Sequence, residues 1–280
     1  MEEDGLKRLL TAAEDIARRA GAEIMKRYEG TTVYTKSDGS NVTDADYAAE
    51  SVILPALREL TPDIPIVSEE RVAHGEIPDI SKGTFWTVDP LDGTHEFINK
   101  TGAFVVAIAL VVDGKAVMGI VYHPAMELMY SGRGPGTATK VGDEGIRTPL
   151  VARETPGSDM RFVVNGPHAD MTRIKGYLST HFRRSSARID DTSGILRACQ
   201  VADGLADGAI VYADKRNGRT AFWDVAPGHA IIESAGGRVE ALDGKPLVYN
   251  AEDLQVPPHI VISAQQAKKL KANKADFSLG

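Results

Sequence analysis

Thr87-Val88-Asp89-Pro90-Leu91-Asp92-Gly93-Thr94 decides the fold, and it follows the apolar pair Phe85-Trp86. The apolar residues predict a strand that ends at two carboxylates three residues apart. Pro90 fixes its own φ and disfavours helix at Asp89, while Gly93 permits a sharp turn and a close approach of the backbone to a ligand. Oxygen acceptors and backbone donors then lie side by side, which suits a hard cation that bridges to a phosphate. An ordinary β-turn explains the same residues, because Asp, Pro and Gly are common in turns.

Two further segments place acidic residues beside apolar elements. The first is Ile64-Pro65-Ile66-Val67-Ser68-Glu69-Glu70, which predicts a short strand ending in paired carboxylates. The second runs from Phe222 to Gly237, and in it Asp224 follows an aromatic pair at the start of a predicted apolar helix. Taken alone, each acid is explained as well by helix capping or a surface ion pair as by a functional site, and Asp224 in particular by helix capping. The three segments together therefore carry more information than any one of them.

In this order and at these separations, the three segments resemble the signature of the lithium-sensitive, Mg²⁺-dependent phosphomonoesterases. This group comprises inositol monophosphatases, bisphosphate nucleotidases and fructose-bisphosphatases. The resemblance extends from about Leu9 to about Val261, and the Glu96-Phe97 pair is similar to bacterial 3'(2'),5'-bisphosphate nucleotidases of the sulfate-assimilation type. It implies an α/β (α+β) fold, a layered αβαβα sandwich with mixed sheets in two halves and the active site between them.

The resemblance also implies the ligands of two or three Mg²⁺ ions. Donors that are all oxygen favour Mg²⁺ over Zn²⁺, and carboxylates gathered without a cation would repel one another. Four carboxylates and one carbonyl form the expected metal site: Glu69, Asp89, Asp92, Asp224 and the Leu91 carbonyl. The residues expected to contact the substrate are Leu91, Asp92, Gly93, Thr94 and Asp224.

Asp46 and Thr94 are the residues expected, with Glu69, to act in catalysis. By resemblance, the Thr94 hydroxyl bonds the Asp46 carboxylate, and the two orient and deprotonate the attacking water. Glu70 is expected to orient the ligands from outside the metal site. Asp46 also stands three residues after Thr43, at the spacing of a capping box, so that helix capping is an equally good interpretation of Asp46 without the resemblance.

Charge and composition restrict the classes of partner. The net charge of −7 over 280 residues argues against a binder of nucleic acid polymers, which needs a basic face, but not against an anionic small-molecule phosphomonoester recruited through cations. The single Cys199 excludes an internal disulfide and fits a reducing compartment. Phe104–Val112 is the longest apolar run and is too short for a membrane span of about 20 residues. We therefore expect no membrane span and a cytoplasmic location, and the sequence leaves a homodimer open.

The chain is expected to divide near residue 152. Residues 1–152 would carry most of the metal ligands, and residues 153–280 would carry Asp224 and the specificity segments. Asp113-Gly114 between two apolar runs predicts a hairpin in the first half. In the second half we expect a helix over 224–235 and a short strand at Val248-Tyr249.

The leading functional hypothesis is hydrolysis of the 3'-phosphate of adenosine 3',5'-bisphosphate to AMP and phosphate. An inositol or sugar-phosphate phosphatase is the alternative within the same class. A catalytically silent metal- or nucleotide-binding regulator is the alternative from another class, and the intact acidic set argues against it. Tyr212 and Phe222 are the aromatic candidates for stacking adenine. His168 follows Asn165-Gly-Pro where the nucleotidases often carry Ser-Arg-Ser, and this departure puts a nucleobase or second-phosphate contact at His168 in doubt.

Overall fold

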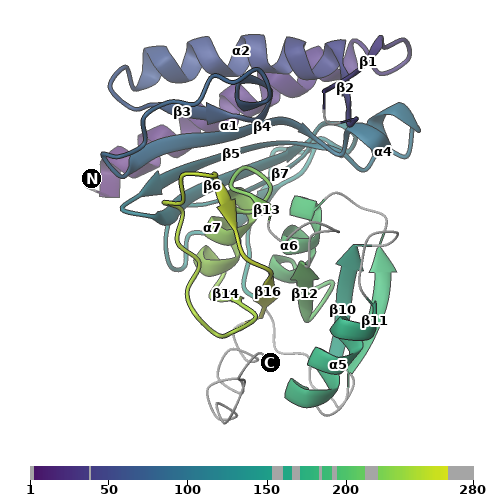
Figure 1. Ribbon diagram of the computed structural model, residues 1–280. Helices are drawn as coiled ribbons and strands as arrows, with labels where there is room; N and C mark the ends of the chain where they lie inside the picture. The colour runs from purple at the N-terminus through teal and green to yellow at the C-terminus, as the bar shows by residue number, and fades with distance from the viewer. Residues whose placement is uncertain are drawn as a thin grey trace.

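The structure is a computed structural model, and it describes residues 3–37, 39–152, 160–165, 171–182, 185–190, 194–211 and 220–263. Its main elements stack in five layers (Figure 1). Two long helices form the first layer, a seven-stranded sheet the second, two helices the third, a five-stranded sheet the fourth and one helix the fifth. This arrangement confirms the αβαβα sandwich and the mixed α/β class.

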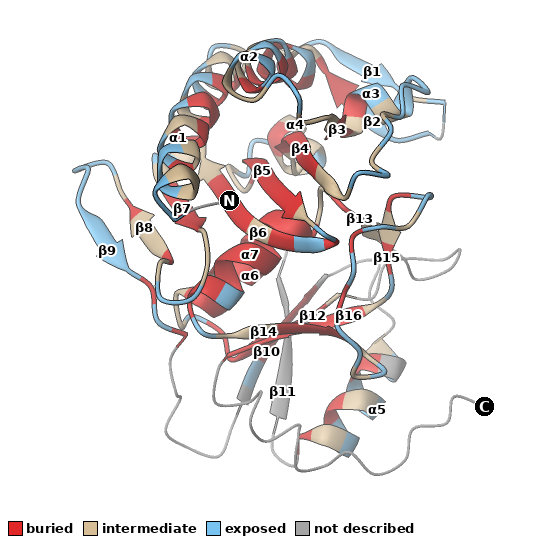
Figure 2. Cartoon of the chain, turned by 90° about the vertical axis from the view of Figure 1, so that its left-hand side faces the viewer, coloured by how far each residue is buried: buried red, intermediate tan, exposed pale blue. Residues whose placement is uncertain are grey.

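The first layer consists of α1 (Glu3–Met25) and α2 (Asp44–Leu60), which pack on each other and on one face of the seven-stranded sheet. In α1 the apolar residues recur at helical spacing, so that one side of the helix, including Ile16 and Ile24, is buried. Figure 2 shows the same pattern, with buried residues along the inner side of both helices.

The second layer is a sheet with the strand order β3-β4-β5-β6-β7-β8-β9. β3 pairs in parallel with β4, and the other neighbouring strands are antiparallel. Asp113 and Gly114 join β5 to β6 with positive φ at both positions, as the hairpin signal predicts. The strands are β3 (Ile66–Ser68), β4 (Thr84–Asp92), β5 (Val105–Val112), β6 (Lys115–His123), β7 (Leu128–Gly132), β8 (Thr139–Val141) and β9 (Arg147–Pro149).

The third layer consists of α6 (Gly194–Ala202) and α7 (Ala226–Ser234), which cover the other face of this sheet. α7 lies directly on β6 because Gly119 has no side chain: a Cβ there would be 2.2 Å from the Pro227 carbonyl oxygen. With helices on both faces, β5 is buried along nearly its whole length, which explains its continuous apolar sequence.

The fourth layer is a sheet with the strand order β11-β10-β12-β16-β14, and α5 (Met171–His181) packs on its outer face. Its strands are β10 (Met160–Asn165), β11 (Ser185–Asp190), β12 (Gly208–Val211), β14 (Arg238–Ala241) and β16 (His259–Ile262). The remaining short elements are β1 (Val33–Thr35), β2 (Asn41–Thr43), α3 (Glu69–Ala73), α4 (Thr94–Ile98), the 3₁₀ helix η1 (Pro124–Met126), β13 (Thr220–Ala221) and β15 (Gln255–Val256).

Two expectations about local structure were wrong. Val248-Tyr249 forms no strand, because Tyr249 is held instead by its fully buried ring and by an N–H that donates to the Gly114 carbonyl. The helix expected from Asp224 begins at Ala226, with Val225 as its N-cap, so Asp224 is not the cap. The division at residue 152 stays a prediction. None of the described helices combines the length and the apolar character that crossing a membrane requires.

Candidate functional site

The turn from β4 into α4 holds the central carboxylates. Asp89 is opposite Ala107 of β5 and Asp92 is opposite Val105, so the register shifts between them and the chain bulges. Within the bulge, the Leu91 N–H donates to Asp89 Oδ1 at 2.9 Å. Gly93 follows with φ of 95°, and a Cβ on it would lie 2.9 Å from the Ala103 carbonyl oxygen, so only glycine fits there.

Asp46 makes the hydrogen bonds that both interpretations of this residue require. Its Oδ2 accepts the Thr43 N–H at 2.8 Å and the Thr43 hydroxyl at 2.7 Å, and a complete capping box opens α2. Its Oδ1 accepts the Thr94 hydroxyl at 3.2 Å, across 48 residues of sequence. Thr94 Oγ1 also lies 3.3 Å from the Leu91 carbonyl oxygen. The start of α2 and the start of α4 are therefore joined at one buried carboxylate.

Glu69 and Glu70 open α3 directly after β3, and both contact one cation. Lys36, on the turn that follows β1, donates to Glu69 Oε1 at 2.8 Å and to Glu70 Oε1 at 2.7 Å. Burial lowers the pKa of Lys36, but the two carboxylates outweigh burial and hold that pKa above its ordinary value. The Glu70 side chain is almost fully buried, and its Oε2 has no hydrogen-bond partner in the part of the chain that the structure describes.

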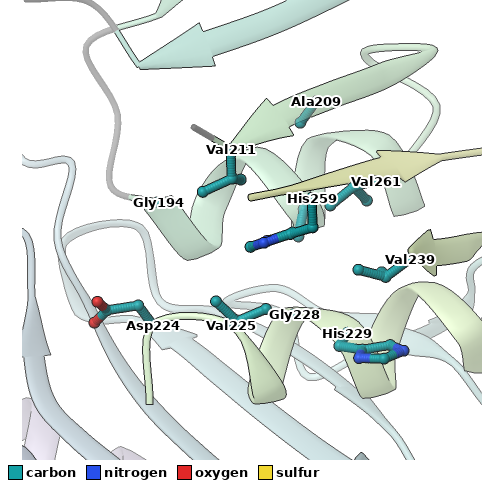
Figure 3. Close-up of a pocket in the computed structure, with 11 residues that line it drawn as sticks. Gly194, Ala209, Val211, Asp224, Val225, Gly228, His229, Val239, His259 and Val261 are labelled. Atoms are coloured by element: carbon teal, nitrogen blue, oxygen red, sulfur yellow. The ribbon is translucent and has the colours of Figure 1, made fainter. Parts of the chain in front are cut away.

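The second half of the chain reaches this site at Asp92, which it contacts, and at Asp224, which it contributes. The Ile195 N–H in the first turn of α6 donates to Asp92 Oδ2 at 3.2 Å. Asp224 precedes α7 and lies at one end of a narrow pocket between α7 and the five-stranded sheet, with His259 farther along it (Figure 3). That pocket holds only about 10 Å³, room for roughly one water, and is too small for a phosphate ester.

Burial and mutual repulsion raise the pKa values of these acids. Burial comes first and the charge of Glu69 second in raising the pKa of Asp89 and of Asp224 far above the ordinary value, and Asp92 adds to both. Burial likewise raises the pKa of Asp46 to about 6, against the hydrogen bonds from Thr43. Burial and Glu69 raise the pKa of Glu70 to about 7. The fold gathers more negative charge than its own cations neutralise.

The expected site residues therefore lie in one region, where they interact through hydrogen bonds and charge. Within the described ranges, no three His, Cys, Asp or Glu side chains are already drawn together as closely as around a bound ion. Sequence reasoning missed Lys36 as a contact of Glu69 and Glu70, and it missed the Ile195 N–H. The only signal for Lys36 was a basic residue in a polar Gly-containing segment, and a backbone N–H on α6 left no signal at all.

Phe222 cannot serve as the expected adenine platform. Its ring is fully buried, stacked on Phe85 at 6.1 Å and in edge contact with Tyr249 at 5.3 Å. The aromatic residue two positions before Asp224 is therefore a core residue. Tyr212 and His168, the other positions considered for base contacts, lie outside the described residues.

Sequence comparison relates the whole chain to known proteins. A sequence profile of the Inositol monophosphatase family matches residues 6–275. The 3'(2'),5'-bisphosphate nucleotidase CysQ of Escherichia coli O6:H1 is 40% identical over 251 residues, which is 89% of this chain and 96% of that protein. CysQ of Buchnera aphidicola is 33% identical over 255 residues, 87% of this chain and 88% of that protein.

Comparison with solved structures agrees. CysQ from Bacteroides thetaiotaomicron, described as a bacterial member of the inositol monophosphatase family, matches with a TM-score of 0.74 and 31% identity, over 92% of this chain and 97% of that one. Inositol monophosphatase from Anabaena matches with a TM-score of 0.70 and 26% identity, over 95% of both chains. The matches in sequence and in structure each span nearly the full length, and the chain therefore belongs to the inositol monophosphatase family.

Proposed function

We propose that the protein is a metal-dependent phosphomonoesterase that removes the 3'-phosphate from adenosine 3',5'-bisphosphate, giving AMP and phosphate. The observation that carries the proposal is the buried, under-neutralised group of carboxylates beside the Asp46–Thr94 pair. The relatives named 3'(2'),5'-bisphosphate nucleotidases support the substrate class, since they align with 89% and 87% of the chain.

The residues fit a hard divalent cation. Burial and the charge of Glu69 raise the pKa of Asp89 and of Asp224, and Glu70 Oε2 is a buried acceptor without a hydrogen bond in the described chain. Oxygen donors of this kind favour Mg²⁺. The residues that would hold Mg²⁺ are Glu69, Asp89, Asp92, Asp224 and the Leu91 carbonyl. When bound, the ion would neutralise the phosphoryl oxygens and lower the pKa of water.

The chain's own residues would supply the proton transfer. Water attacks phosphorus as the bond between phosphorus and the 3'-oxygen breaks. One proton of the water passes to the chain, and the 3'-oxygen takes up a proton from solvent and leaves as a hydroxyl. The Thr94 hydroxyl donates a hydrogen bond to Asp46 Oδ1, so the Thr94 oxygen can accept a hydrogen bond from the attacking water. A pKa of about 6 places Asp46 near neutral pH, where a general base works best. The Gly93 and Thr94 amides are the proposed donors to the phosphate.

A phosphate-release assay tests both the reaction and the substrate. Adenosine 3',5'-bisphosphate, inositol 1-phosphate and fructose 1,6-bisphosphate are compared at equal concentrations in Mg²⁺, with parallel samples in excess chelator. We expect the highest kcat/KM for the adenosine bisphosphate, no turnover in chelator, and inhibition by Li⁺ but not by equal Na⁺. Full turnover in chelator would exclude the metal mechanism. Preference for inositol 1-phosphate would assign the chain to the alternative substrate class, and no turnover of any ester would favour a silent regulator.

A further inference from the structure

Glu50 contacts the two residues that flank the Glu69-Glu70 pair. It lies on α2 and is 6% exposed. Its Oε1 accepts the Ser68 hydroxyl at 2.6 Å, and its Oε2 lies 3.3 Å from Arg71 Nε. Ser68 comes just before the pair and Arg71 just after it, so that one carboxylate of α2 holds the chain on both sides of the two acids.

The short helix α3 needs such an external support. It has five residues, and a helix of that length has little stability of its own. Ser68 is its N-cap residue, but the Ser68 hydroxyl caps no α3 amide and is bonded to Glu50 instead. The direction in which Glu69 and Glu70 project is therefore set by contacts from outside α3, and Lys36 provides the others on the carboxylate side.

Glu50 also lies one turn after Asp46 on the same helix. Residues four apart on a helix share a face, so α2 presents one carboxylate to Thr94 and the next to Ser68. A rigid helix thus fixes the separation between the proposed water-activating pair and the segment that carries Glu69.

We infer that Glu50 is a positioning residue, which orients Glu69 and Glu70 for metal uptake through Ser68 and Arg71. The inference rests on the proposed function, because it assigns Glu50 a role toward the ion that these acids would hold. Residues that orient metal ligands typically contribute roughly 10–100-fold to metal affinity. A purely structural role for Glu50 would instead lower stability and leave metal affinity unchanged.

The test measures Mg²⁺ and Mn²⁺ affinity by titration calorimetry on the full chain, without substrate. The variants are Glu50→Ala, Glu50→Gln and Ser68→Ala, with Glu59→Ala as the matched control, since Glu59 is an exposed acid of the same helix. We expect Glu50→Ala to weaken metal binding about 10–100-fold, and Glu50→Gln to recover part of the loss because its amide oxygen still accepts the Ser68 hydroxyl. Glu59→Ala should bind as the wild type does.

Ser68→Ala keeps the test decisive if Glu50→Ala does not fold. It removes one hydroxyl and should weaken metal binding several-fold. Thermal unfolding in chelator should show that this variant is folded. The double variant, Glu50→Ala with Ser68→Ala, should bind metal no more weakly than the weaker-binding single variant. Both changes remove the same hydrogen bond between Ser68 and Glu50. Wild-type affinity in folded Glu50→Ala or Ser68→Ala would overturn the inference. A wild-type chain that binds neither ion would instead overturn the proposed function.

Discussion

Glu14 and Asp89 are buried to the same degree, each 2% exposed, but their surroundings are opposite. Glu14 of α1 accepts hydrogen bonds from the two terminal nitrogens of Arg147, at 2.9 and 2.6 Å, and from the Ser131 hydroxyl at 2.6 Å. Asp89 receives the Leu91 N–H, and the nearby charges that act on it most strongly are other carboxylates. Arg147 neutralises the Glu14 carboxylate, whereas the Asp89 carboxylate is repelled by the neighbouring carboxylates.

The difference separates structural acids from site acids. Glu14 ties the β8–β9 hairpin to α1, and its hydrogen bonds raise the pKa of Arg147. Leaving Asp89 without a cation costs stability, because a buried charge without a partner is unfavourable. A fold that retains such a group has a use for it, and a bound cation supplies the partner that the chain does not.

Asp89→Asn should give the largest effect. It removes the central proposed ligand, so we expect turnover to fall by more than the roughly 10²–10⁴-fold that a general base contributes. Without metal, the variant should unfold at a higher temperature than the wild type, because repulsion among the carboxylates is relieved. Phosphate release in Mg²⁺ measures the loss of turnover, and thermal unfolding in chelator measures the gain in stability. Asp113→Asn, in an exposed turn, is the control. Near-normal turnover of the Asp89→Asn variant would show that Asp89 is not one of the metal ligands.

Thr94→Ala should come next, with kcat reduced roughly 10²–10⁴-fold and KM changed little, because the hydroxyl acts on the attacking water. Asp46→Asn should lose a similar amount, and the double variant should be little worse than either single. Steady-state kinetics of all three with one substrate decides the matter. Thr101→Ala, an exposed loop residue, should be unaffected. Losses that multiply would mean that the pair acts independently and that Asp46 mainly caps α2.

Glu14→Ala removes the buried ion pair between Glu14 and Arg147. Removing one partner of a buried ion pair typically destabilises by about 3–5 kcal/mol, because the other charge is left uncompensated. The exposure of Arg147 moderates this, since its side chain is 46% exposed and solvent screens it. Urea unfolding should show the loss, while kcat of the folded enzyme stays near wild type. The exposed neighbour Asp15→Ala is the control. A large fall in kcat with unchanged stability would place Glu14 among the functional acids.

The smallest expected effect is a pH dependence of the metal-free protein. Asp46 and Glu70 have folded pKa values of about 6 and about 7, above the unfolded values near 4. The folded chain therefore keeps protons that the unfolded chain has lost, and the free energy of unfolding should fall as pH rises from about 4 to 7. Saturating Mg²⁺ should weaken or reverse this slope, because the ion binds the deprotonated acids. Equal slopes with and without Mg²⁺ would contradict the cation site.

Local signals predicted most of the first half of the fold. The Asp113-Gly114 turn predicted the β5–β6 hairpin, and the spacing of Thr43 and Asp46 predicted the capping box, because in each case the partners are close in sequence. The start of α7 was placed two residues early, since an acid before an apolar helix is the usual cap and here Val225 occupies that position. The αβαβα layering itself came from the resemblance and not from periodicity.

The site was predictable where motifs carried it and unpredictable where distant segments meet. Asp89 and Thr94 follow from a contiguous motif, whereas Lys36, Glu50 and the Ile195 N–H reach the site only through tertiary packing. Phe222 shows the converse error, because an aromatic residue beside a proposed ligand gives no indication of whether its ring faces the core or the substrate. Nothing short of the packed chain distinguishes these cases.

Asp224 reaches the other proposed ligands only when α7 has docked on β6, at the bare backbone of Gly119. During synthesis on the ribosome, the acids from Glu69 to Asp92 therefore emerge long before the last member of the set. A nascent chain in the cell carries an open group of carboxylates that is completed only near the end of translation. Any truncated product that stops before residue 224 would lack one member of the proposed ligand set and, with it, the proposed activity.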